Sequence, residues 1–70
     1  MTCPEAICES LADRLATART RYLMGDHAEA REMLQAVRLD YLRFRDVLRG
    51  MPGDLALRRG LESAEGVMGI

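Results

Sequence analysis

Apolar residues between Cys8 and Leu48 recur at alternating steps of three and four positions. Such spacing has the 3.5-residue repeat of a coiled-coil seam, which predicts amphipathic helices and argues against strands. One seam consists of Cys8, Leu11, Leu15, Ala18 and Tyr22, and the other of Ala30, Leu34, Val37, Tyr41, Phe44 and Leu48. Each predicted helix therefore has one apolar face that must pack against another element.

A short turn separates the two seams. Gly25 is placed to end the first helix in the left-handed conformation, and Asp26 with Glu29 forms the capping-box pattern that opens the second. When the chain folds back at Asp26, the two seams face each other as mirror images. The pattern thus predicts an all-α fold built on an antiparallel helical hairpin.

The residues that flank the seams carry opposite charges at two of the predicted contacts. Folding at Asp26 places Arg14 opposite Asp40 and Glu5 opposite Arg45. Exposed ion pairs contribute about 0.2–1 kcal/mol each. These pairs are therefore expected to tune the register of the hairpin, while the apolar seam holds it together.

A third, shorter helix is predicted after the turn that contains Gly50 and Pro52, because proline cannot continue the second helix. Asp54 is expected to cap this helix, and Gly60 to weaken it by about 1 kcal/mol relative to alanine. Its apolar face consists of Leu57, Leu61, Ala64 and Met68.

The capping and turn residues give approximate helix limits. Thr2 with Glu5 forms a second capping box, which opens the first helix. We predict helices over about residues 3–24, 27–49 and 55–66. The glycine-rich segment after residue 66 is expected to fray.

The chain of 70 residues allows one domain with a small core. A domain of this size buries only about 60% of its unfolded surface, and oligomerisation is a common remedy. Leu39 and Leu42 lie off the second seam, so the hairpin has apolar surface to spare. We leave open whether the third helix packs on its own hairpin or on a second chain, and expect a homodimer or a helical bundle.

Charge and targeting signals change this picture little. The net charge of −1 gives no general attraction to nucleic acid or to an anionic membrane. All ten basic residues are arginine, which we interpret as codon bias in a GC-rich bacterial or phage genome. No apolar run reaches the roughly 20 residues of a membrane span, and no signal-peptide pattern occurs, so we expect a cytoplasmic protein.

The reactive residues are too few and too scattered for a catalytic or metal site. Cys3 and Cys8 lie at one end of the predicted hairpin, and His27, the only histidine, lies at the other. A zinc site needs about four ligands, and a nucleophile needs an adjacent base. We therefore expect no enzyme activity, no metal and no cofactor.

The segment YLMGDHAEAREMLQAV resembles the middle of a tetratricopeptide repeat. In that family an aromatic residue precedes a Gly-Asp turn, and small residues pack where the helices meet; here these positions are held by Ala18, Tyr22, Gly25, Asp26 and Ala30. The resemblance covers about half of one unit, and His27 stands where the family prefers an aromatic residue. In size and architecture the chain is also similar to small hairpin co-chaperones of bacterial type III secretion and to phage-encoded inhibitors of host regulators. These resemblances imply protein binding.

The surplus of apolar surface predicts a non-catalytic protein-interaction module, such as a small adaptor, co-chaperone or inhibitor. Its partner is expected to be another protein, a second copy of itself, or both, and not a nucleic acid or a membrane. The predicted binding residues are Leu39, Leu42, Arg38, Arg45, Arg49, Leu57, Leu61 and Met68. The alternative is a small DNA-binding regulator that uses the arginine-rich second helix, although Asp40 and Asp46 interrupt the basic run.

Overall fold

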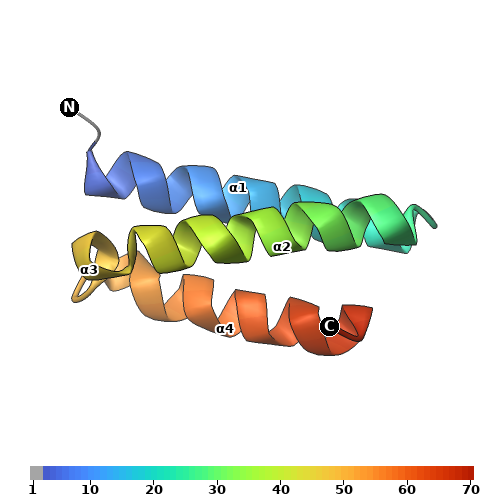
Figure 1. Ribbon diagram of the computed structural model, residues 1–70. Helices are drawn as coiled ribbons and strands as arrows, with labels where there is room; N and C mark the ends of the chain where they lie inside the picture. The colour runs from blue at the N-terminus through green and yellow to red at the C-terminus, as the bar shows by residue number, and fades with distance from the viewer. Residues whose placement is uncertain (1–2) are drawn as a thin grey trace.

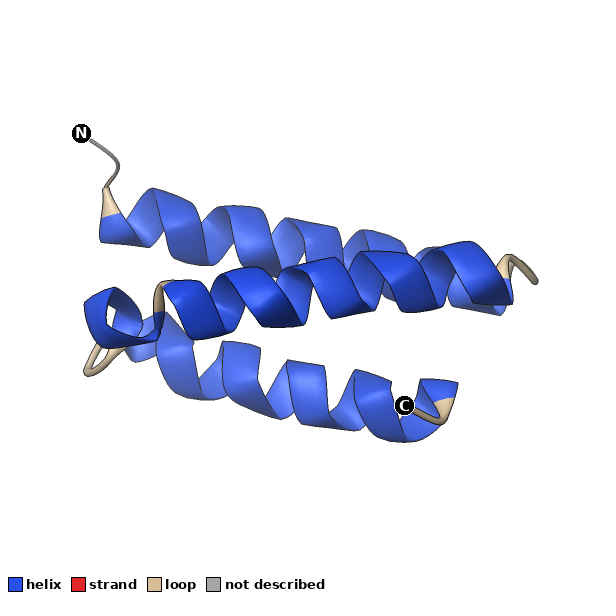
Figure 2. Ribbon diagram, viewed as in Figure 1, coloured by secondary structure: helices blue, strands red, loops and turns tan. Residues whose placement is uncertain are grey.

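The structure, a computed structural model, describes residues 3–70 and is helical, with no strand among these residues (Figures 1 and 2). The helices are α1 (Pro4–Leu23), α2 (His27–Arg43), the short α3 (Arg45–Leu48) and α4 (Pro52–Met68). α1 and α2 run antiparallel, and α4 lies along both of them (Figure 1). The predicted all-α class is confirmed.

The core lies where the two seams meet. Leu11, Leu15 and Ala18 of α1 are buried, as are Ala30, Leu34, Val37 and Tyr41 of α2. The outer seam residues Cys8, Tyr22 and Phe44 are partly buried and pack against this cluster. The 3.5-residue repeat thus identifies residues that are buried in the fold, because each seam residue returns to the same side of its helix.

The bend between α1 and α2 depends on Gly25, which adopts a φ of +99°. This left-handed conformation lets the Asp26 N–H donate to the Arg21 carbonyl at 2.9 Å, which closes the helix end. Asp26 occupies the N-cap position of α2, but its side chain makes no capping hydrogen bond. Instead, the rings of Tyr22 and His27 stack across the bend with centroids 4.2 Å apart.

The second predicted helix is interrupted at Phe44, which has φ −101° and ψ 12°. No glycine or proline marks this position in the sequence. The break separates the turn α3 from α2, and Leu48 at the end of α3 is fully buried. Leu48, the last residue of the predicted seam, thus stays in the core although the helix is interrupted before it.

α4 is longer than the expected helix at both ends. Pro52 occupies its first turn, where the missing N–H has no cost, and Met51 takes the N-cap position in place of Asp54. The C-terminal segment is helical to Met68, whose side chain is 1% exposed, and Gly69 ends the helix with a φ of +73°. The prediction of a frayed end is wrong because Met68 is a core residue, and Arg31 Nε donates to its carbonyl at 2.9 Å.

α4 packs on its own hairpin through Leu57, Leu61, Ala64 and Met68, all of them buried. Its close approach to α1 requires Gly60, where a Cβ atom would lie 2.9 Å from Leu15 Cδ2. A Cβ atom on Gly53 would similarly lie 2.8 Å from Cys8 Sγ. Because Cys8 neighbours Gly53 and Leu15 neighbours Gly60, α1 and α4 run in the same direction. The remaining capping prediction concerned Thr2, which lies outside the described residues.

Candidate functional site

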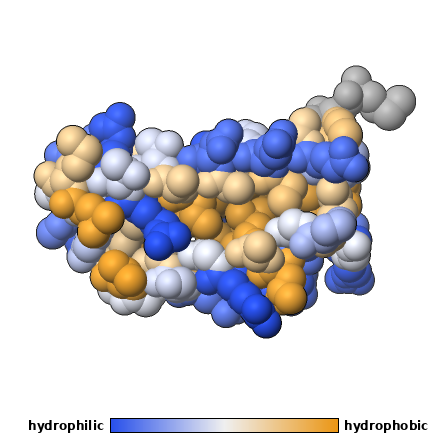
Figure 3. All heavy atoms as spheres, turned by 180° about the vertical axis from the view of Figure 1, so that it is seen from behind, coloured by the Kyte–Doolittle hydropathy of each residue, from blue (hydrophilic) through white to orange (hydrophobic). Residues whose placement is uncertain are grey.

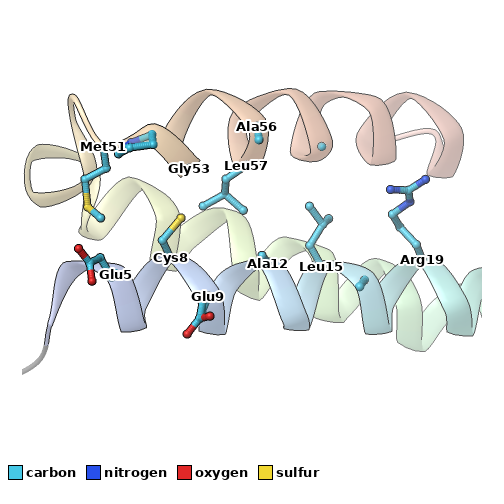
Figure 4. A pocket seen from close by; sticks show the side chains of 13 residues that line it. Glu5, Cys8, Glu9, Ala12, Leu15, Arg19, Met51, Gly53, Ala56 and Leu57 are labelled. Carbon is cyan, nitrogen blue, oxygen red and sulfur yellow. The ribbon is translucent and has the colours of Figure 1, made fainter.

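A groove of about 610 Å³ runs between α1 and α4, on the side of the molecule away from α2 (Figure 4). Figure 3 views the molecule from this side and shows a band of hydrophobic side chains between hydrophilic ones. The floor of the groove is formed by Leu15 and Leu57, which are also core residues. We call this feature the α1–α4 groove.

Small residues produce the groove. Ala12 and Ala16 line it from α1, and Ala56 and Gly60 line it from α4. Their side chains are too short to fill the space between two parallel helices. As a result the floor leucines, although buried, come close to the surface along the groove, and the walls of the groove are almost entirely apolar.

Charged residues mark the two ends of the groove. Glu5 lies at the end near Met51, Glu9 lies one helical turn further along α1, and Arg19 lies at the opposite end (Figure 4). Within residues 3–70, none of the ion pairs involves these three side chains. Their charges are therefore free to pair with complementary charges on an incoming molecule.

A second apolar surface contains two of the predicted binding residues. Leu39 is 68% exposed and Leu42 is 50% exposed, both on the outer side of α2. Arg38 lies beside them and pairs with Glu65 of α4 at 3.6 Å. We call the surface formed by Leu39, Leu42 and Arg38 the α2 face.

The other predicted arginines lie close to the α2 face. Arg45 begins the short α3 and is exposed. Arg49 follows α3 and pairs with Asp46 at 3.8 Å. The structure thus leaves Arg38, Arg45 and Arg49 on the surface, although acidic neighbours already compensate two of the three charges.

Leu57, Leu61 and Met68, which the sequence assigned to partner binding, are core residues of this fold. Leu57 and Leu61 are each 4% exposed, and Met68 is 1% exposed. The open question of where the third helix packs is therefore answered by docking on its own hairpin. This placement corrects the predicted surface, because only Leu57 reaches an opening, as part of the groove floor.

A polar cluster links α2 to α4 inside the molecule. The Tyr41 hydroxyl donates to Asp54 Oδ1 at 2.8 Å, and Arg58 Nη2 donates to Asp54 Oδ2 at 3.2 Å. Arg58 Nε also donates to the Tyr41 hydroxyl, and this hydrogen bond, with the nearby Asp54 carboxylate, raises the pKa of Arg58. Each polar group already has a partner, so the cluster is suited to fastening α4 to α2, with no group held ready for chemistry.

Other candidate chemistry is sparse in the part of the chain that the structure describes. No group of three or more His, Cys, Asp or Glu residues there could hold a metal ion. Cys3 is exposed and Cys8 half-buried, and both carry free thiols. None of the described helices is both long and apolar enough to cross a membrane.

Sequence reasoning missed the α1–α4 groove, although a signal for it exists. Besides its buried seam, α1 carries a second stripe at steps of four and three, made of Glu5, Glu9, Ala12, Ala16 and Arg19. Alanines in the middle of a helix are ordinary helix formers, so this stripe becomes informative only when α4 lies beside it.

Comparison with known proteins gives no match to this chain. No family model fits it, and neither a curated protein nor a solved structure is significantly similar to it. The resemblance of the bend to a tetratricopeptide unit therefore gains no support, and function must be argued from the surfaces described above.

Proposed function

We propose that this protein is a non-catalytic protein-interaction module that binds other polypeptides through its apolar helix faces. The observation that carries the proposal is the α1–α4 groove, an apolar channel between parallel helices with leucines on its floor and charges at its ends. Helix-in-groove recognition uses surfaces of this kind, with apolar anchors in the middle and charges that set the orientation. An adaptor, co-chaperone or inhibitor would use the groove in this way.

The polarity of the groove favours a polypeptide over a small molecule. Small-molecule sites combine an apolar lining with a few polar groups that converge on the ligand. Here the charged side chains Glu5, Glu9 and Arg19 all lie on α1, two of them at the ends, and no charged side chain of α4 lines the groove opposite them. A helix that lies along the groove would reach both ends, because its apolar side chains recur along its length.

The α2 face offers a second contact area to a partner. Leu39 and Leu42 present exposed side chains on one helix, beside Arg38 and Arg45. Interface cores are commonly apolar, with arginine among the residues enriched around them. The free thiols of Cys3 and Cys8 agree with a cytoplasmic location for such a module, which is part of this proposal.

DNA binding, the alternative from the sequence, finds less support in the arrangement of charges. Arg14, Arg38, Arg49 and Arg58 each pair with an acidic side chain. A nucleic-acid surface needs several arginines on one face that are free to reach phosphates. The arginines of this protein are instead spread over its surface and partly neutralised.

Site-specific photocrosslinking in cells of the native host would test the proposal. A benzoyl-phenylalanine replaces Ala16 in the groove or Leu39 on the α2 face, with exposed Glu62 as the control position. We expect discrete adducts to proteins other than this chain, which survive nuclease treatment, from position 16, position 39 or both, and none from position 62. Adducts at both positions that contain only copies of this chain, only nucleic acid, or nothing would contradict the proposed function.

A further inference from the structure

Glu5 and Arg19, at the two ends of the α1–α4 groove, are placed so that each would face the opposite charge on a second copy of the groove turned end to end. Glu5 and Arg19 line the groove from α1, and each lies seven residues from Ala12, in opposite directions along the helix. Seven residues are two helical turns, or about 10.5 Å, and return to nearly the same side of the helix. The acidic and the basic end are therefore equidistant from Ala12 and face the same way.

We propose that the occupant of the groove is a second copy of this chain, packed groove against groove around a two-fold axis at the level of Ala12. This inference rests on the proposed function, since it assigns the partner of the same groove. In the dimer α1 runs antiparallel to the partner's α1. Glu5 of each copy then faces Arg19 of the other, so the contact contains two symmetric ion pairs. Glu9, three residues from Ala12, lies at the level of Leu15 of the other copy and takes no part in these pairs.

The same axis brings the two α4 helices together. Gly53 lies beside Cys8 and Gly60 beside Leu15, an offset of 45 residues in both cases, so the level of Ala12 on α1 corresponds to Leu57 on α4, next to Ala56. Around the axis the two α4 helices also run antiparallel, with Ala56 near the crossing point and a glycine on either side. Small residues at this position let the backbones approach closely, so that the exposed alanines of the groove, Ala12, Ala16 and Ala56, become covered in both copies.

The size of the molecule places this contact at the small end of stable interfaces. The chain extends 35 × 21 × 16 Å, so one long face covers several hundred Å². A stable interface typically buries about 800 Å² on each partner. Because so small a domain gains only a marginal core of its own, burying the groove would add the apolar contacts of a four-helix bundle formed by two α1 and two α4 helices.

The dimer leaves the α2 face open. α2 contributes no residue to the groove, and Leu39 and Leu42 lie on its outer side. A dimer would therefore display two copies of the α2 face to a different protein. Self-association through the groove and foreign binding through α2 can thus be tested with separate substitutions.

Sedimentation equilibrium of the purified full chain over a concentration series tests the proposal. We expect a monomer–dimer equilibrium that Glu5→Arg or Arg19→Glu alone weakens about tenfold or more, because each change turns two attractive pairs into repulsive ones. Mixed in equal amounts, the two variants should recover the native affinity as a heterodimer. In that heterodimer the new arginine faces the new glutamate, and one native pair is retained.

Two further variants make the result specific to the groove. Ala12→Glu places two like charges at the axis and should give a monomer with unchanged helicity by circular dichroism, since Ala12 is exposed in a single copy. Glu32→Arg changes the net charge as much as Glu5→Arg does, but lies on α2 and should leave the dimer intact.

A chain that stays monomeric at all concentrations, or a dimer indifferent to both groove reversals and to Ala12→Glu, would overturn this inference. Neither result would contradict the proposed function, because that proposal is tested by photocrosslinks to other proteins. An adduct from position 16 to a different protein, in a chain that is monomeric when pure, would assign the groove to a foreign helix and reject the second copy.

Discussion

The Tyr41 hydroxyl lies 2.8 Å from the Asp54 carboxylate and joins the last turn of α2 to the first turn of α4. Asp54 is 7% exposed, which makes it the only charged residue among the buried side chains of residues 3–70. Arg58 balances its charge from one turn further along α4 at 3.2 Å. The docking of α4 therefore depends on a polar contact as well as on its leucines.

Removing the Tyr41 hydroxyl should loosen α4. We expect Tyr41→Phe to lower the free energy of unfolding by about 1–3 kcal/mol, because one oxygen of a buried carboxylate loses its hydrogen-bond donor. Urea denaturation followed by circular dichroism measures the change. Tyr22→Phe is the matched control, since the Tyr22 hydroxyl makes no hydrogen bond among those of residues 3–70. Equal effects of the two substitutions would refute the role of the Tyr41–Asp54 contact.

Core and surface leucines of α2 should respond very differently to truncation. Leu34 is fully buried, so Leu34→Ala should cost about 2–5 kcal/mol through lost burial and the cavity that remains. Leu39 is 68% exposed, and Leu39→Ala should change stability by no more than about 0.5 kcal/mol. Thermal unfolding of the two variants compares them directly. A large loss at Leu39 in the pure protein would show that this side of α2 is covered.

Gly60 and Gly66 lie inside α4 in different surroundings. Replacing each of them with alanine should therefore separate the effect of helix propensity from the effect of packing. Nothing lies within 4 Å of a Cβ atom placed on Gly66, so Gly66→Ala should stabilise the protein by about 0.5–1 kcal/mol. A Cβ atom on Gly60 would lie 2.9 Å from Leu15 Cδ2, so Gly60→Ala should gain less, because the leucine must move. Urea midpoints measure both changes, and a larger gain at Gly60 would contradict the close approach of α4 to α1.

The ion pair between Arg14 and Asp40, at 2.6 Å, should contribute modestly and depend on salt. Both side chains are more than one-third exposed, so a double-mutant cycle with Arg14→Ala and Asp40→Ala should give a coupling of about 0.5–1 kcal/mol at low ionic strength. The coupling should shrink in molar salt, where screening is strong. A coupling of zero at low salt would mean that the pair does not help to set the register of the hairpin.

Most features of the α1–α2 hairpin can be predicted from the local sequence pattern. The seams of α1 and α2 follow directly from steps of three and four residues, and Arg14 meets Asp40 as the fold-back at Asp26 predicts. Gly25 adopts the left-handed conformation that was predicted from its position at the end of the first helix. These features depend on residues close in sequence or related by the helical repeat, so periodicity and turn chemistry contain the information needed.

The candidate site was less accessible to this reasoning. Leu39 and Leu42 were expected on the surface and lie there, but Leu57, Leu61 and Met68 are buried in the core. An apolar stripe predicts that one side of a helix is buried, but it does not predict which other element packs against that side. The α1–α4 groove went unnoticed because alanine and glycine carry no strong pattern of their own.

The sequence by itself determined the helical class, the two seams and the place of the first bend, since these follow from the helical repeat and from turn preferences. Only the tertiary structure decided the burial of Met68 at the end of α4, the use of Asp54 as a buried link to Tyr41, and the groove. Each of these depends on contacts between residues far apart in the chain. Their energies arise when α4 packs on the hairpin, and no local preference of the residues involved encodes them.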